Sequence, residues 1–171
     1  DENIMKKVEI ENLEYCEENS WHDELYHFLL ELSEDTYMEA LAFYLRDFTF
    51  DGIPEIVAFH NAAGVTLYAY QGDSFKEICG SSRSWIYGFE EVPIIAIKYG
   101  PHMLQSGVTY FRINNCEMEV LAEAWEEYVE IDDTEAVNSY RVENEDVDEQ
   151  RFYQYVGELI GADNLKNEEE I

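Results

Sequence analysis

The residues best suited to chemistry lie in one nine-residue run that begins at Asp47 and ends at Glu55. Oxygen-bearing side chains occupy its first, third, fifth and ninth positions, at Asp47, Thr49, Asp51 and Glu55, and Ile53 offers a backbone carbonyl at the seventh. A hard cation such as Ca²⁺ takes about 6–8 oxygen ligands, and a glycine at the sixth position permits the sharp turn. The spacing therefore predicts a calcium loop with these five residues as ligands, and Ca²⁺ is the one cofactor that the sequence suggests.

The same run also has a purely structural interpretation. Asp51-Gly52 is a strong turn dipeptide, and Pro54 is tolerated at the first residue of a strand. The run is not an EF-hand, because Ala58 stands where the bidentate carboxylate belongs and a strand follows instead of a helix. Both interpretations, calcium loop and turn, remain open at this point.

No other residues form a recognisable catalytic set. The four histidines are scattered, and Cys16, Cys79 and Cys116 lack the paired spacing of a zinc site. Carboxylate pairs are too abundant for any one of them to indicate acid–base catalysis. Trp85 and Trp125 could line a sugar-stacking surface, with core or cross-strand packing as the alternative. We therefore expect a protein that is not an enzyme.

The charge of the chain limits its partners. Its 171 residues include 39 acidic and 10 basic side chains, a formal net charge of −29. Such a surface repels nucleic-acid phosphates and anionic lipid headgroups, so a cationic partner or plain solubility explains it better. The longest aliphatic run is too short to span a membrane. The chain opens on acidic residues, which indicates a cytoplasmic protein or a mature form whose leader has been removed.

The elements that would position the loop can be read from periodicity. Apolar residues at helical spacing predict a first helix at about 21–33 within a segment 20–34, with Ser20 as its N-cap. A segment 138–161 should hold a strand at 138–142 and a last helix at 149–160, with Asp148 as N-cap and Gly161 as stop. A loosely ordered arm at 1–19 and a frayed tail at 162–171 complete the chain.

The middle of the chain alternates with the period of strands and contains an internal echo. Gly64-Val65-Thr66 returns as Gly107-Val108-Thr109, 43 residues later, and each copy continues into a polar turn, at Asn114-Asn115 in the second. A period of about 40–45 residues is that of a propeller blade. We therefore predict a single α+β domain over 1–171, in which an antiparallel β-meander forms two four-stranded, blade-like repeats at 39–79 and 84–122, flanked by an N-terminal and a C-terminal helix.

The run from Asp51 to Val57 resembles the Asp-Gly-Ile-Pro-Glu motif of FG-GAP/VCBS-type repeats in extracellular proteins. Over about 20–165 the chain is similar to uncharacterised secreted or lipoprotein domains of Gram-positive bacteria, which also carry a helix led by a tryptophan, here Trp21. Those domains normally have Asp or Asn and then Gly or Asn where this chain has Thr49 and Phe50. The resemblance implies an extracellular or cell-surface location after removal of a leader, and it implies no activity.

These observations favour a non-catalytic secreted or cell-surface module with a binding or structural role, whose ligand is a protein or a carbohydrate. An alternative is an acidic inhibitor or immunity-type protein that binds a basic partner protein, a role suggested by the excess of negative charge. A third is a hydrolase whose site is assembled from carboxylates by the fold. Neither the ligand nor the oligomeric state follows from the sequence.

Overall fold

A computed structural model describes residues 20–34, 40–60, 64–89, 91–102, 105–129, 135–161 and 164–165. The predicted arm at 1–19, with Cys16, lies outside the described residues, as does the predicted tail apart from 164–165.

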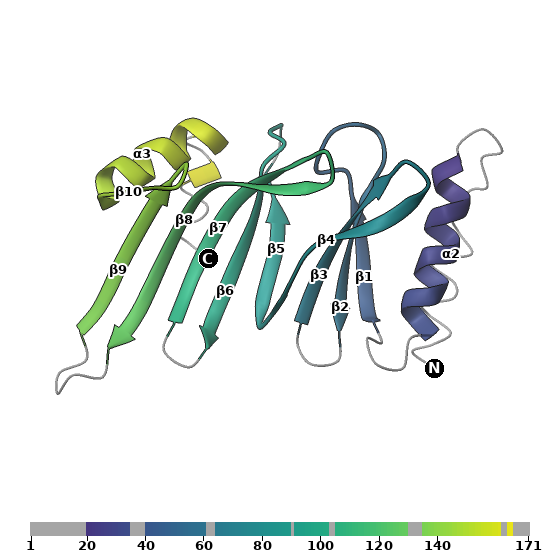
Figure 1. Cartoon of the computed structure of the whole chain (residues 1–171), viewed down its shortest axis with the longest axis horizontal. Helices are drawn as coiled ribbons and strands as arrows, with labels where there is room; N and C mark the ends of the chain where they lie inside the picture. The colour runs from purple at the N-terminus through teal and green to yellow at the C-terminus, as the bar shows by residue number, and fades with distance from the viewer. Residues whose placement is uncertain are drawn as a thin grey trace.

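The described chain forms two antiparallel sheets and two helices (Figure 1), which confirms the α+β class. The first sheet has the order β1-β2-β3-β4 and the second β10-β9-β8-β7-β6-β5, so within each sheet every strand pairs with its neighbours in sequence, and the chain passes from one sheet to the other between β4 and β5. The elements are α2 (Ser20–Glu34), β1 (Ala40–Arg46), β2 (Glu55–His60), β3 (Gly64–Gln71), β4 (Ser74–Ser82), β5 (Ser84–Gly88), β6 (Ile95–His102), β7 (Gln105–Asn114), β8 (Glu117–Val129), β9 (Glu135–Val142), β10 (Glu145–Val147) and α3 (Glu149–Ile160).

Both predicted helices are present. Helix α2 begins at Ser20 itself, one residue before the predicted start, and buries Leu25, Leu29 and Leu32 against the first sheet. Helix α3 begins after Asp148, whose carboxylate accepts the Arg151 N–H at 2.8 Å, as an N-cap does. None of the described helices is long and apolar enough to cross a membrane.

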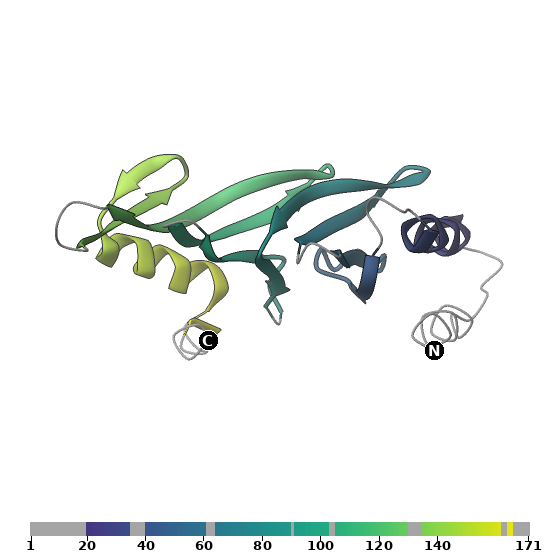
Figure 2. The ribbon, with the colours of Figure 1, turned by 90° about the horizontal axis from the view of Figure 1, so that it is seen from below.

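Three buried clusters arrange these elements in the order α2, first sheet, second sheet, α3. Ile56 and Ala58 on one face of the first sheet pack against α2. Val57 and Leu67 on its other face pack against a face of the second sheet. The remaining face of the second sheet is covered by Phe152, Val156 and Ile160 of α3. The two helices therefore lie at opposite ends of the molecule (Figures 1 and 2).

The strand registers of the two sheets correspond. The β3–β4 pairing shifts by one residue between Leu67 and Tyr68, and the β7–β8 pairing shifts between Tyr110 and Phe111. Gly64 opens β3, the third strand of its sheet, while Gly107 lies within β7, the third strand of the next. Leu67 and Tyr110 are 43 residues apart, and so are Tyr68 and Phe111, which is the separation between Gly64 and Gly107.

Two boundaries in the structure differ from those predicted from the sequence. The second polar turn is Asn115-Cys116 rather than Asn114-Asn115, and both its residues have positive φ, as a tight hairpin turn requires. The single strand predicted at 138–142 is the longer β9, followed by a turn at Glu143-Asn144 and by β10. A further hairpin therefore precedes α3.

Candidate functional site

The Asp47–Glu55 loop joins β1 to β2 at the edge of the first sheet. Both carboxylate oxygens of Asp47 accept backbone N–H groups across the loop, from Asp51 at 3.2 Å and from Gly52 at 2.9 Å. Asp51 in turn accepts the Ile53 N–H at 2.8 Å. Two of the three predicted charged ligands therefore stabilise the turn that contains them.

Glu55 points into the protein. Its side chain is nearly buried, with 3% of the residue exposed, and accepts the Phe48 N–H at 2.6 Å and the Thr49 hydroxyl at 3.1 Å. Burial, with a smaller contribution from the neighbouring charges of Asp51 and Asp47, raises the pKa of Glu55 to about 7 against the opposing effect of the two hydrogen bonds. Near neutral pH this carboxyl group is therefore divided between its protonated and charged forms.

The loop places the Phe48 side chain in the core between the two sheets. Phe48 is 3% exposed and packs with Val57 and Ile86, which belong to different sheets. Gly88 on β5 makes room for it, because a Cβ there would overlap the Phe48 ring. The Arg46 guanidinium covers the same ring, 5.4 Å from its centroid. The hydrogen bond from Phe48 to Glu55 thus fixes an anchor that joins the sheets.

As arranged, the predicted calcium ligands do not converge on a cation. The Asp47 and Asp51 oxygens are hydrogen-bonded to the loop backbone, the Thr49 hydroxyl is turned to Glu55, and Glu55 is turned inward. Among the residues that the structure describes, no group of three or more His, Cys, Asp or Glu side chains is placed to hold a metal ion. The geometry favours the turn over the calcium loop, which stays a prediction.

Calorimetric titration of Ca²⁺ into the native protein and an Asp51→Ala variant tests this. We expect equal, weak heats from both, because Ca²⁺ would only condense on a surface of net charge −29. A saturable binding step in the native protein that the variant lacks would restore the calcium loop with its predicted ligands.

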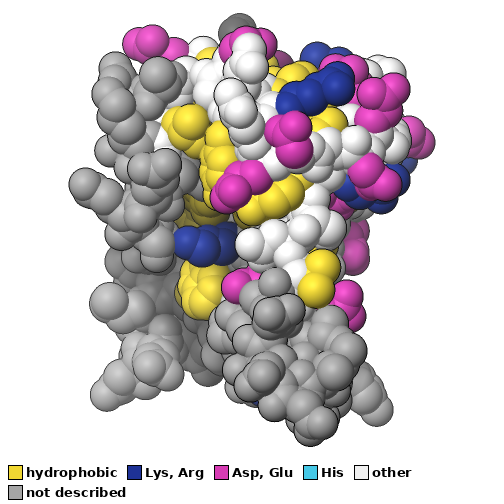
Figure 3. Space-filling model, turned by 90° about the vertical axis from the view of Figure 1, so that its left-hand side faces the viewer, with side chains coloured by type: hydrophobic (Ala, Val, Ile, Leu, Met, Phe, Trp, Pro, Cys, Tyr) yellow, Lys and Arg dark blue, Asp and Glu magenta, His cyan; other side chains and the backbone are white. Residues whose placement is uncertain are grey.

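An open groove of about 380 Å³ crosses the α3 side of the second sheet. It runs over strands β6 to β9 beside α3 and is lined by Lys98, Tyr99, Ser106, Gly107, Val108, Tyr110, Ala124, Trp125, Glu126, Asn138, Tyr140, Phe152, Tyr153 and Leu165. Figure 3 looks at this end of the molecule, where hydrophobic side chains and a Lys or Arg side chain share a hollow of the surface.

Strand pairing places the groove side chains in rows. Lys98, Val108, Ala124 and Tyr140 are successive cross-strand partners, and Trp85 continues the row on β5 beside Lys98. The neighbouring row holds Ser106, whose hydroxyl donates to Glu126 at 3.2 Å, and then Asn138. The floor is formed by small side chains, and the polar and aromatic groups stand around it.

Two aromatic residues beside this groove are unusually exposed. Trp85 is 56% exposed, so core packing is the wrong interpretation for it. Trp125 differs, because its ring stacks on that of Tyr99 with the ring centroids 4.8 Å apart. Tyr153 on α3 is 42% exposed and touches Tyr140 across the groove, at 6.3 Å between ring centroids. Sequence reasoning singled out Trp85 but missed Lys98, Asn138 and Tyr153, which only strand register and the position of α3 bring together.

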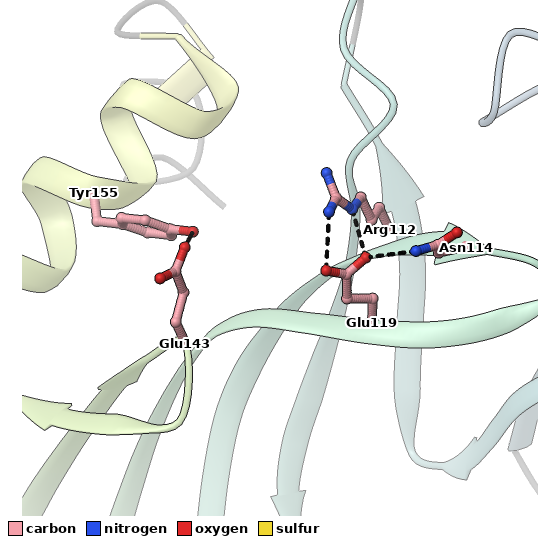
Figure 4. A network of polar contacts seen from close by, with 5 residues as sticks. All are labelled: Arg112, Asn114, Glu119, Glu143 and Tyr155. Carbon is pink, nitrogen blue, oxygen red and sulfur yellow. Dashed lines mark hydrogen bonds and ion pairs between the residues drawn. The ribbon is translucent and has the colours of Figure 1, made fainter.

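The polar network in Figure 4 lies on the exposed surface and has a structural role. Arg112 on β7 donates to both oxygens of Glu119 on β8, at 2.7 and 2.9 Å, and Asn114 donates to Glu119 at 3.2 Å. Nearby, Tyr155 of α3 donates to Glu143 at 3.0 Å. The first group fastens a hairpin and the second fastens α3 to the β9–β10 turn.

The described thiols are poor nucleophiles. Burial raises the pKa of Cys79 to about 12 and also raises that of Cys116, whose thiol donates to the Tyr70 carbonyl at 3.4 Å. Since the thiolate is the reactive form of cysteine, neither side chain offers covalent catalysis.

Comparison with known proteins finds no matching family model, no matching curated protein and no matching solved structure.

Proposed function

We propose that this chain is a non-catalytic binding module of the cell surface or the extracellular space, whose groove beside α3 holds a neutral, polar ligand such as a segment of carbohydrate. The observation that carries the proposal is the lining of that groove. The exposed ring of Tyr153, the partly buried ring of Tyr140 and hydrogen-bonding side chains surround a floor of small residues, in a volume of about 380 Å³ that suits a small ligand.

The chemistry of the lining favours a neutral ligand over an ion. Lys98 and Glu126 contribute opposite charges to one groove, while Ser106 and Asn138 offer both donors and acceptors. Tyr140 and Tyr153 present ring surfaces with polar tips, which suit a ligand that is apolar on its ring faces and wet at its edges. Sugar rings have these properties.

The scaffold under the groove is, in this proposal, a duplicated four-stranded unit. The bulges at Ile78 of β4 and Leu121 of β8, the fourth strand of each unit, support it because a bulge is a specific and retained feature of a strand pair. The groove belongs to the second unit, because there β9 extends the sheet and α3 lies beside it. The resemblance of the Asp51–Val57 run to repeats of extracellular proteins supports the proposed location.

The test is a titration of the ¹⁵N-labelled protein with neutral oligosaccharides, such as chitotriose and maltotriose, followed by NMR. We expect saturable shifts at Lys98, Asn138 and Tyr153. A Tyr153→Ala variant should bind about 5-fold more weakly, since an aromatic contact contributes about 1 kcal/mol.

The matched control is Tyr26→Ala, because Tyr26 on α2 is 41% exposed, almost as much as Tyr153 at 42%, and lies at the other end of the molecule. Its affinity should equal that of the native protein. Absence of any saturable shift would refute the carbohydrate site. Salt-sensitive binding of a basic polypeptide such as polylysine, spread over the acidic surface, would instead favour the acidic inhibitor.

A further inference from the structure

A second cavity, also of about 380 Å³, lies where the chain passes from the first sheet to the second. Arg83, which connects β4 to β5, lines it together with Phe59 of β2 and with Ser84 and Trp85 of β5. The groove proposed to bind carbohydrate has none of Phe59, Arg83 and Ser84 in its lining. The cavity is therefore a separate site.

Ser84 carries a buried polar group without a partner. The residue is 6% exposed, and its hydroxyl has no hydrogen-bond partner among the residues that the structure describes. An unsatisfied buried hydroxyl is unfavourable, and native proteins contain few of them. A group bound in the cavity beside it could accept or donate the missing hydrogen bond.

Among the residues that the structure describes, Arg83 has no carboxylate partner, although the protein is strongly acidic. Three other arginines, Arg112, Arg141 and Arg151, form ion pairs with glutamate or aspartate, whereas within the described part of the chain no ion pair involves Arg83. Its backbone has a φ of 54°, which few side-chain-bearing residues adopt, and its carbonyl accepts the Gly100 N–H at 2.8 Å. The fold thus holds the backbone of Arg83, one of the residues that line the cavity, in an unusual conformation.

The other walls are apolar or closely fitted. Phe59 and Trp85 contribute ring surfaces, and His60 is held on the far side by a 3.0 Å hydrogen bond to Thr66. Gly100 has no space for a side chain, because a Cβ there would lie 2.9 Å from the Arg83 carbonyl oxygen and 3.1 Å from the Trp85 ring. The backbone and the indole ring are therefore packed closely around the cavity.

We propose that this cavity binds a small organic carboxylate with an apolar body. The Arg83 guanidinium pairs with the carboxylate, and planar guanidinium and carboxylate groups match in a two-bond geometry. The Ser84 hydroxyl donates to the same carboxylate and so gains its missing partner. The apolar body of the ligand lies against Phe59 and Trp85.

Phenylacetate is a suitable probe, with 2-phenylethanol as its uncharged analogue. The readout is the indole N–H resonance of Trp85 in an NMR titration, assigned by its loss in a Trp85→Phe variant. We expect saturable binding of phenylacetate and binding of 2-phenylethanol at least about 10-fold weaker, because a charged hydrogen-bonded pair contributes more than a neutral one. Net repulsion by a chain of charge −29 makes unspecific binding of an anion an unsuitable explanation.

Two variants, with a third as a control, give the proposal its sharpest test. Arg83→Gln should abolish the preference for phenylacetate over 2-phenylethanol, while Arg151→Gln, which removes an exposed arginine on α3, should leave it intact. Ser84→Ala should raise the melting temperature of the free protein, because the unsatisfied hydroxyl is gone, and yet weaken phenylacetate binding.

The proposal is overturned if phenylacetate causes no saturable shift of the Trp85 resonance, or if Arg83→Gln binds it as tightly as Arg151→Gln does. A rise in the melting temperature of Ser84→Ala without loss of affinity would also overturn it, since the hydroxyl would then have no part in binding. None of these outcomes depends on whether the groove beside α3 binds oligosaccharides.

Discussion

A Glu55→Gln variant should be more stable than the native protein at pH 8, by about 2 kcal/mol, and should lose this advantage at pH 5. The reason is the buried position of the Glu55 carboxyl group, whose pKa lies at about 7 in the folded protein. The amide side chain of the variant would keep an oxygen for the Phe48 N–H without introducing a charge. Urea denaturation of both proteins from pH 5 to pH 8 measures the difference.

The sign follows from proton binding. The folded protein keeps the Glu55 proton up to a pH of about 7, whereas the unfolded chain releases it near the ordinary value of 4.5. The protonated carboxyl group therefore favours the folded state fully below pH 4.5, and this contribution is lost as the pH rises through 7. Titration of the many surface carboxylates affects both proteins alike, so the difference between them isolates Glu55.

Glu119→Gln provides the opposite case as a control. The hydrogen bond from Arg112 lowers the pKa of the exposed Glu119, so its contribution is present at neutral pH and is lost on acidification. Between pH 6 and pH 8 the free energy of unfolding of the Glu119→Gln variant should change with pH as much as that of the native protein does. If the free energies of unfolding of the native protein and of Glu55→Gln changed equally from pH 5 to pH 8, Glu55 would be charged throughout this range and well solvated.

A Gly107→Ala substitution should destabilise the protein by about 2–3 kcal/mol, because overpacking a fitted position has that cost. A Cβ at Gly107 would lie 2.6 Å from the Ala124 carbonyl oxygen and 2.6 Å from the Trp125 ring. The carbonyl belongs to the paired strand β8 and cannot move without breaking the ladder. In a thermal melt the midpoint should fall by roughly 5–10 °C.

Gly64→Ala is the matched control, since Gly64 occupies the corresponding place in the first sheet. A Cβ there meets only the Ser81 carbonyl oxygen at 3.5 Å, an ordinary contact. Its melting temperature should stay within a few degrees of the native value or rise slightly, since alanine loses less backbone freedom on folding. Equal losses from both substitutions would mean that glycine is needed at this position for its backbone alone.

The predictable part of the fold is the part that depends on local pattern. Both helices follow from the spacing of residues such as Leu25 and Leu29 or Phe152 and Val156, and the strand alternation follows from period two. The hairpin at Glu143-Asn144 escaped notice because neither its turn residues nor the acidic β10 carries an apolar signal. Its short strand is held by pairing to β9, which a local pattern does not reveal.

The site was harder to predict because its determinants are distant in sequence. The sequence of the Asp47–Glu55 loop is compatible with both orientations of the Glu55 side chain, toward a cation or toward the protein interior. The orientation of Glu55 follows from the burial of Phe48. The pocket of Phe48 is formed with the second sheet, where Gly88 leaves room for the ring. Similarly, Lys98 and Tyr153 become neighbours of one groove only after strand pairing and the docking of α3.

The order of layers also bears on how copies of this chain could assemble. Ile56 and Ala58 face α2, while Ile95 and Ile97, which hold the corresponding register positions in the second sheet, face the first sheet. The two sheets therefore meet front to back, a contact that can repeat without closing. A fragment that lacks both α2 and α3 would expose complementary sheet faces at its two ends, and such fragments could assemble into filaments. A helix that remained in place would cover its face of the sheet and stop growth at that end, so α2 and α3 cap the two faces through which such a filament would extend.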